Sequence, residues 1–210
     1  KFGNPSDLGY PEVDGWTTRS AIRTRTMWLL IAGSNLGSLV ETTLTFHLIN
    51  YLQDFNLSRE RASLIFSLNF LGFMLSRVVY AFALEHFPVS YCLMANVLAR
   101  AFGLMSLILL PFPVGIPLFL VSHGVLGGSF GVLTSYAWAR YYGRRFIGSI
   151  RGINRLFMMS SLVGPVFAGS VRDITGSYGG VFTILVGLSL LGAFLLFHAK
   201  APVSKEIRAE

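Results

Sequence analysis

The stretch FLGFMLSRVVYAF, Phe70 to Phe82, decides the fold class, because it is apolar almost throughout and carries one full charge, Arg77. A membrane-spanning helix needs about 20 predominantly apolar residues. The apolar run around this stretch extends over Ala62–Leu84, which is long enough. It predicts a transmembrane helix with an arginine near its middle, where a charge is costly and marks a functional-site candidate.

The composition extends this prediction to the whole chain. Of its 210 residues, 53% are hydrophobic and 13% are charged, whereas soluble domains carry roughly 25% charged residues. With a mean hydropathy of +0.60, the sequence predicts an all-α membrane protein embedded in a lipid bilayer. The net charge of +7 does not predict a nucleic-acid partner, because in a membrane protein the placement of charges matters more than their sum. The lone Cys92 and the lack of a Cys/His cluster predict no disulfide, metal or cofactor.

Six apolar segments follow a polar beginning, and each is long enough to cross a bilayer. Residues 1–26 are predicted to be a solvent-exposed tail, residues 27–200 a six-helix bundle and residues 201–210 a C-terminal tail. Since the chain begins with Lys1, we expect it to be part of a longer protein. The predicted spans are Trp28–Tyr51, Ala62–Leu84, Ser90–Leu110, Ile116–Trp138, Ile153–Ser170 and Tyr178–His198.

The distribution of lysine and arginine predicts the orientation, because cytoplasmic loops of membrane proteins are enriched in these residues. One side of the predicted bundle holds only Arg59, Arg61 and Arg172. Both termini are therefore predicted to be cytoplasmic, in a multi-pass protein of the cell membrane. The other side holds most of the chain's basic residues, namely Lys1, Arg19, Arg23, Arg25, Arg140, Arg144, Arg145, Arg151, Lys200, Lys205 and Arg208.

Polar residues recur on one face of three predicted helices, as judged at about 100° per residue. Polar side chains are costly in hydrocarbon, so these faces predict a bundle around an aqueous cavity. For a single serine or threonine, interhelical hydrogen bonding is the favoured role. The residues are Ser34, Ser38, Glu41 and Thr45 in the first helix, Asn69, Ser76 and Tyr80 in the second, with Arg77 at the edge of that face, and Ser122, Ser129 and Tyr136 in the fourth.

Among the charged residues inside predicted spans, Glu41 and Arg77 are the strongest functional candidates, since charges near the bilayer centre cost at least ~2.5 kcal/mol. For Arg100 we favour a structural ion pair or hydrogen bonds to backbone carbonyls. Arg155, close to the end of its helix, is expected to extend to the membrane surface. For His47 and His123 we favour a role as hydrogen-bonded core residues.

The sequence GGSFG, Gly127 to Gly131, matches the nucleophile elbow of serine hydrolases. Ser129 and His198 nevertheless differ in depth by roughly 10 Å at 1.5 Å per residue, beyond the hydrogen-bond reach of about 3 Å. The strand–turn–helix context of the elbow is also missing, so we do not expect an enzyme. Glycine pairs in this region, Gly124 with Gly128 and Gly127 with Gly131, predict close helix approach, and Gly164-Pro165 predicts a kink.

Two stretches resemble the major facilitator superfamily. YYGRRFIGSIRG followed by SSLVGPVFAGSVRDITGSYGG is similar to the family's tenth-to-eleventh helix region, and FHLINYLQDFNLSRERAS is similar to the end of its seventh helix. The resemblance implies the C-terminal six-helix half of a twelve-helix transporter, built as a 3+3 inverted repeat. The N-terminal half would be its partner, residues 1–26 the remnant of a central loop, and the first and fourth helices would line the cavity.

The chain departs from the family's loop motif between its second and third helices. Of the expected pattern G-x-x-x-D-R-x-G-R-R, only the acid remains, as Glu85. We expect Glu85 to pair with Arg151 or Arg155 as a degraded gate. Arg77 resembles an arginine of the monocarboxylate and oxalate:formate branches, although the monocarboxylate branch has an aspartate where this chain has Phe73.

Three functions stay open at this point. The first is alternating-access transport of a small organic anion, with Arg77 binding the carboxylate and Glu41 carrying a coupled proton. The second is transport of a neutral or cationic solute, with Arg77 and Glu41 as a structural ion pair. The third is a non-transporting scaffold or receptor. The residues expected to line a substrate site are Arg77, Glu41, Ser38, Asn69, Ser76, Tyr80, Ser129 and Tyr136.

Overall fold

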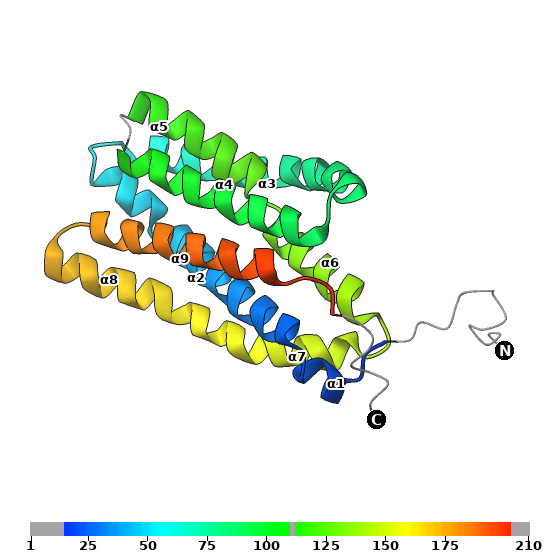
Figure 1. Ribbon diagram of the computed structural model, residues 1–210. Helices are drawn as coiled ribbons and strands as arrows, with labels where there is room; N and C mark the ends of the chain where they lie inside the picture. Colours follow the sequence, from blue (N-terminus) through cyan, green and yellow to red (C-terminus); the bar gives the residue numbers. More distant parts are fainter. Residues whose placement is uncertain (1–14, 110–111, 203–210) are drawn as a thin grey trace, which may run out of the picture.

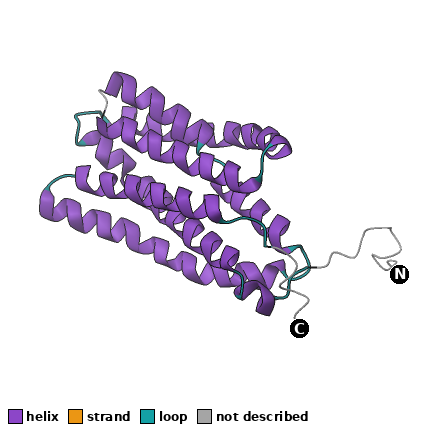
Figure 2. Ribbon diagram, viewed as in Figure 1, coloured by secondary structure: helices purple, strands orange, loops and turns teal. Residues whose placement is uncertain are grey.

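The computed structural model describes residues 15–109 and 112–202, and every regular element in these ranges is helical (Figure 2). The prediction of an all-α protein is confirmed for this part of the chain. The elements are α1 (Thr18–Ile22), α2 (Arg25–Gln53), α3 (Arg59–His86), α4 (Val89–Leu109), α5 (Phe112–Phe119), η2 (Leu120–Leu126), α6 (Phe130–Tyr142), α7 (Ile147–Met158), η3 (Met159–Leu162), α8 (Val163–Thr175) and α9 (Gly179–His198).

The short polar connections start and stop the helices. The side chain of Thr24 accepts a hydrogen bond from the Met27 backbone and begins α2, and Ser58 does the same for Arg61 at the start of α3. Asn56, between these two helices, has a positive φ of 62°, which asparagine tolerates better than most residues. α8 ends at Gly176 in the left-handed conformation, the usual place for glycine after a helix.

Four helices in the described residues are long and apolar enough to cross a membrane: Arg59–His86, Val89–Leu109, Pro113–Tyr142 and Gly179–His198. These coincide with the second, third, fourth and sixth predicted spans. The first and fifth predicted spans are helical as well, within α2 and α7–η3–α8, but they are not among these four candidates. A multi-pass membrane protein is therefore compatible with the structure, while six spans and the inverted repeat stay predictions.

The two ends of the described chain lie together at one end of the bundle (Figure 1). The Thr26 hydroxyl donates a hydrogen bond of 2.8 Å to the backbone oxygen of Lys200, which joins the start of α2 to the residue just after α9. This end, called the terminal end below, also holds the junction of α3 with α4 and the end of α6. Both described ends on one side agree with an even number of crossings.

Residues 15–26 differ from the predicted exposed tail, because several of them pack against the bundle. Trp16 is buried and its backbone amide donates to the backbone oxygen of Tyr142 at 3.1 Å. The hydroxyls of Thr24 and Tyr142 lie 2.8 Å apart. Residues 1–14 and 203–210 of the two predicted tails, and Leu110 at the end of the third predicted span, lie outside the described residues.

Two apolar clusters fill the bundle, one toward each end. The cluster at the terminal end includes Leu30, Val97 and Phe130, whereas the cluster at the other end includes Leu44 and Leu104. Along α4 and η2–α6, the sequence passes from one cluster to the other through an ionisable residue, and on α2 a charged residue follows Val40, the first residue of the second cluster. These residues, Glu41, Arg100 and His123, form a polar layer near the middle of the bundle.

Glycines bring α3 and η2 into direct backbone contact. A Cβ atom added to Gly72 would lie 2.9 Å from the backbone carbon of Gly124, and one added to Gly128 would lie 2.5 Å from the Cα of Phe73. The pair Gly124 and Gly128 thus packs as predicted, whereas Gly131 has nothing within 4 Å of its added Cβ. The close approach lets short side chains of α3 reach residues of η2.

We expect Gly72→Ala to lower stability by about 1–3 kcal/mol, because the new methyl group meets backbone atoms that cannot move aside easily. The matched control is Gly187→Ala on α9, where an added Cβ has nothing within 4 Å. The unfolding midpoint of the detergent-solubilised protein on titration with SDS measures both variants. Equal midpoints for the two variants would contradict the direct contact between α3 and η2.

Candidate functional site

The rod formed by α5, η2 and α6 is broken in the middle of the bundle. Pro117 lies inside α5, the segment Leu120–Leu126 has π-helical hydrogen bonding, and a turn at residues 127–129 precedes α6. Pro removes a backbone hydrogen bond donor, and π-helical turns are frequent at functional sites. Irregular backbone at membrane depth is tolerated where it is buried in protein or lines a cavity.

Two side chains of α4 bind the backbone oxygens that the break leaves available. Asn96 donates to the oxygen of Leu126 at 3.2 Å, and one turn later the Nε of Arg100 donates to the oxygen of Gly127 at 2.8 Å. Arg100 also lies over the ring of Phe130 with its Cζ 4.8 Å from the centroid. These contacts confirm that hydrogen bonds to carbonyls hold Arg100.

The remaining charge of Arg100 is matched by Glu41 of α2. The Nη2 of Arg100 lies 2.9 Å from Oε2 of Glu41. The Arg100 side chain is 4% exposed and that of Glu41 is 23% exposed, so the Glu41 side chain is partly open to the outside although its Oε2 atom is buried. This is the structural ion pair expected for Arg100, with Glu41 as the partner.

His123 brings a second ionisable group to the same carboxylate. Its Nδ1 lies 3.2 Å from Oδ1 of Asn69 on α3, and its Nε2 lies 3.5 Å from Oε2 of Glu41. With the amide oxygen as acceptor, Nδ1 carries a proton, and in the neutral imidazole Nε2 then carries none. Two acceptors therefore face each other, and a proton held between them would join them.

The polar layer thus connects four rods through one carboxylate. α2 contributes Glu41, α3 contributes Asn69, α4 contributes Arg100 and η2 contributes His123. The ring of Phe119 stacks on His123 with centroids 5.0 Å apart and covers the layer from one side. The arrangement can hold or release a proton while one cation stays buried.

The Arg77–Glu41 ion pair, which the sequence left open as one alternative, is not formed among the described residues, where Glu41 pairs with Arg100. Arg77 is exposed on α3, and the described residues give it neither an ion pair nor a hydrogen bond. Ser76, next to it in sequence, is the residue that turns inward and is fully buried. The reason is geometric: Arg77 stands at the edge of the polar face of α3, while α4 supplies a closer arginine.

The other predicted site residues separate into three groups. Glu41 and Asn69 belong to the polar layer, and Ser38 is half-buried on α2 one turn before it. Three lie inside the bundle, and Tyr136 is exposed near the terminal end. The three buried residues are Ser76, Tyr80 and Ser129. The hydroxyls of the two serines have no hydrogen-bond partner among the described residues.

The predicted gate is not formed in this structure. Glu85 and Arg155 are both exposed, and no described residue forms an ion pair with either. Arg151 instead donates from Nη2 to the hydroxyl of Ser135 on α6 at 3.1 Å. The short connection through Phe87 and Pro88 turns α3 directly into α4 and leaves Glu85 on the outside.

The broken rod α7–η3–α8 is fastened to α2 by polar contacts on both sides of its irregular turn. Asn154 accepts hydrogen bonds from Ser34 at 3.1 Å and from Asn35 at 3.3 Å. Beyond the turn, Nε2 of His47 lies 3.0 Å from the backbone oxygen of Pro165. As predicted, His47 is a hydrogen-bonded residue, and the helical hydrogen bonding changes just before Gly164-Pro165.

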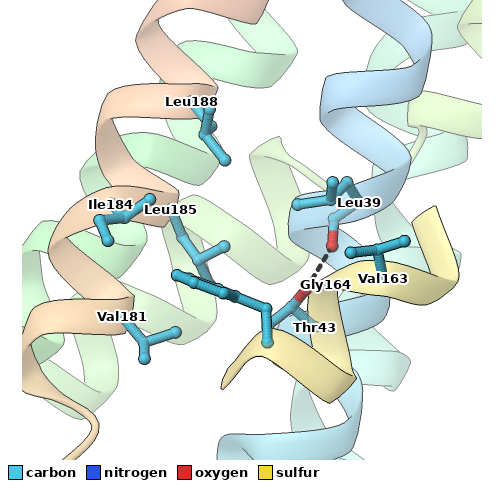
Figure 3. A pocket seen from close by; sticks show the side chains of 9 residues that line it. Leu39, Thr43, Val163, Gly164, Val181, Ile184, Leu185 and Leu188 are labelled. Atoms are coloured by element: carbon cyan, nitrogen blue, oxygen red, sulfur yellow. Dashed lines mark hydrogen bonds between the residues drawn. The ribbon is translucent and has the colours of Figure 1, made fainter. Parts of the chain in front are cut away.

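An apolar cavity of about 130 Å³ separates α8 from α9 next to α2 (Figure 3). Among the described residues that line it, only Thr43 has a polar side chain, and its hydroxyl donates to the backbone oxygen of Leu39 at 2.7 Å. Leu185 and Leu188 of α9 face Val163 and the Leu39 side chain across it. With its polar group already satisfied, this cavity does not suit a charged solute.

Asn96, Arg100 and His123 were absent from the predicted site. Asn96 and Arg100 stand four residues apart, which places them on one helical face, and this spacing was the available signal. The glycines and serine at residues 127–129 also indicate a helix break, although their spacing equally suits close packing.

The sequence matches no known family model, and it matches no curated protein.

We expect Arg100→Met to lower stability by about 3 kcal/mol, because it leaves Glu41 without its charge partner and two backbone oxygens with fewer donors. Glu41→Gln should cost less, since Glu41 is partly exposed. The double variant should cost clearly less than the sum of the two single variants. SDS unfolding midpoints of the four proteins give the coupling energy.

The matched control is Arg77→Met, which removes an exposed arginine from the neighbouring span and should change the midpoint by no more than about 0.5 kcal/mol. Strictly additive effects of Arg100→Met and Glu41→Gln would show that the 2.9 Å contact contributes no coupling. Equal losses of stability in Arg100→Met and Arg77→Met would show that burial of the Arg100 cation does not determine its contribution to stability.

Proposed function

We propose that this protein forms half of a secondary active transporter that moves a small organic anion together with a proton. The observation that carries the proposal is the Glu41 carboxylate, which faces both Arg100 and His123 at the break of a membrane helix. Broken helices near the bilayer midplane are where many transporters place substrates and coupling ions. Ionisable residues inside membranes are rare and mark such pathways.

Glu41 and His123 are the proposed proton site. Their Oε2 and Nε2 atoms are both acceptors when Glu41 is ionised and His123 is neutral, so one proton relieves their repulsion. Uptake of that proton would weaken the contact of Glu41 with Arg100, because a neutral carboxyl attracts the guanidinium less. Proton binding is thereby coupled to the side-chain contact between α2 and α4.

Arg77 is the proposed anion-binding residue. It follows Phe73 by about one helical turn on α3, and the ring of Phe73 lies 5.8 Å from that of His123 in the polar layer. A guanidinium can bind a carboxylate through two parallel hydrogen bonds. Facing lipid, the same charge would cost at least ~2.5 kcal/mol, which supports a second helical unit covering this face.

The resemblance to the major facilitator superfamily supplies that second unit as the N-terminal half of a twelve-helix transporter. In this proposal the six rods all cross the cell membrane as a 3+3 inverted repeat, with both termini cytoplasmic. Exposed apolar side chains on α8, such as Val163 and Val166, would then contact lipid or the second unit. The excess of basic residues predicted for the side that holds the termini supports this cytoplasmic orientation.

A second candidate is a membrane protein that does not transport and uses the polar layer only to fix its helices. The many contacts of the Arg100 side chain, which is bound to Glu41 and to the oxygen of Gly127, favour this role for the pair. The two candidates differ in one measurable property. Only the first predicts anion flux that depends on Glu41.

We expect cells that express the full protein to take up a labelled monocarboxylate, with lactate, pyruvate, formate and oxalate as the test panel. Arg77→Ala should lower uptake about 10- to 100-fold, as for the loss of a hydrogen-bonded charge. Uptake by Arg77→Lys should fall between that of the wild type and that of Arg77→Ala, because lysine keeps the charge and loses the fork geometry. Glu41→Gln should abolish accumulation driven by a pH gradient and leave anion exchange in place.

The matched control is Arg59→Ala, which removes an exposed arginine at the far end of the same helix and should leave uptake unchanged. Surface expression is measured for every variant, so that loss of protein is separated from loss of transport. Full uptake in both Arg77 variants would exclude Arg77 as the anion site. A Glu41→Gln protein that still accumulates anion against a gradient would exclude the proton role.

A further inference from the structure

A second pocket, of about 590 Å³, opens at the terminal end of the bundle and is separate from the polar layer. Its volume falls within the range of about 300–1,000 Å³ that small-molecule sites occupy. Four rods meet there: α3 ends, α4 begins, and α6 and α9 end. The lining residues that matter below are Phe87, Ser90, Tyr136, Arg140, Tyr141 and Lys200.

The charge of the pocket is positive. Arg140 and Lys200 line it, and among the residues that the structure describes none of the lining residues is acidic. Within the described residues neither cation forms an ion pair, and Glu85, the nearest acid along α3, is exposed and lies outside the lining. The first turn of α4 forms another wall, and a helix N-terminus attracts anions through its unpaired amide groups.

The rim of the pocket is aromatic as well as basic. Phe87, in the turn between α3 and α4, is 62% exposed, and Tyr136 on α6 is 41% exposed. Tyrosine and other aromatic rings at this level of a membrane protein lie among the lipid headgroups. The site therefore combines two exposed cations, Arg140 and Lys200, with an aromatic rim that suits the membrane surface.

We propose that this pocket binds the phosphate headgroup of an anionic phospholipid, with Arg140 and Lys200 contacting the phosphate and the aromatic rim contacting the glycerol and the first acyl carbons. Basic pockets between membrane helices on the cytoplasmic side are suited to anionic headgroups. The terminal end is the side predicted to be cytoplasmic, where anionic lipids are concentrated. A soluble phosphate ester shares the headgroup chemistry, but the aromatic rim favours a lipid.

The test is native mass spectrometry of the full detergent-solubilised chain titrated with phosphatidylglycerol, or with phosphatidylcholine of the same acyl chains. Wild-type protein should bind phosphatidylglycerol more tightly. The double variant Arg140→Gln with Lys200→Gln should bind it roughly 30-fold more weakly, as expected for two cations near an anionic surface. Arg140→Lys with Lys200→Arg keeps both charges and should stay near wild type.

The matched control is Arg19→Gln with Arg144→Gln, which removes two exposed cations from the same end that do not line the pocket. Equal loss in this control would overturn the site, since a general surface charge would then explain the binding. Equal binding of both lipids would overturn it as well. Inorganic phosphate should compete only weakly, and full competition at equal concentration would assign the pocket to a soluble phosphate ester instead of a lipid.

This proposal does not depend on transport. Lipid binding is measured without a solute, and Arg140 and Lys200 lie outside the polar layer. Loss of anion uptake in the Arg77 or Glu41 variants would leave the lipid titration unchanged. Failure of one proposal is therefore distinguishable from failure of the other.

Discussion

The ion pair between Arg100 and Glu41 is the interaction around which the middle of this protein is organised. A guanidinium that is only 4% exposed has to be matched by acceptors, and the break in the α5–η2–α6 rod supplies one of them as a backbone oxygen. Conversely, the free oxygens at the break need donors, and Asn96 and Arg100 provide them. The charged pair and the irregular helix therefore stabilise each other, because each supplies hydrogen-bond partners that the other needs.

Close packing decides which side chains take part in this layer. The contact of Gly72 with Gly124 draws α3 onto η2, and this brings Asn69 within hydrogen-bond distance of His123. A larger residue at either glycine would hold the two helices apart, and His123 would lose the partner that fixes its ring. The backbone contact between α3 and η2 therefore links helix packing to the protonation of His123 in the polar layer.

The sequence predicted the helices well and their pairing poorly. Apolar length and capping residues, such as Ser58 before α3, depend on neighbours in sequence, so they locate helices without knowledge of the tertiary structure. The partner of Glu41 depends on which helix lies opposite, and one helical face cannot reveal that. The sequence favours Arg77 because a polar face stands beside it, whereas in α4 Asn96 and Arg100 are accompanied only by two serines in a mainly apolar run. Two of the six predicted spans, within α2 and α7–η3–α8, are helical but are not among the four helices long and apolar enough to cross a membrane.

The apolar cavity between α8 and α9 has a mechanical consequence. The α7–η3–α8 rod is fastened to α2 through Asn154 on one side of its irregular turn and through the oxygen of Pro165 on the other, while its side toward α9 carries the void. Closing or widening an empty apolar space breaks no hydrogen bond. The bundle is accordingly stiff between α2 and this rod and compliant between the rod and α9, so a load on the bundle would displace α8 toward α9 first.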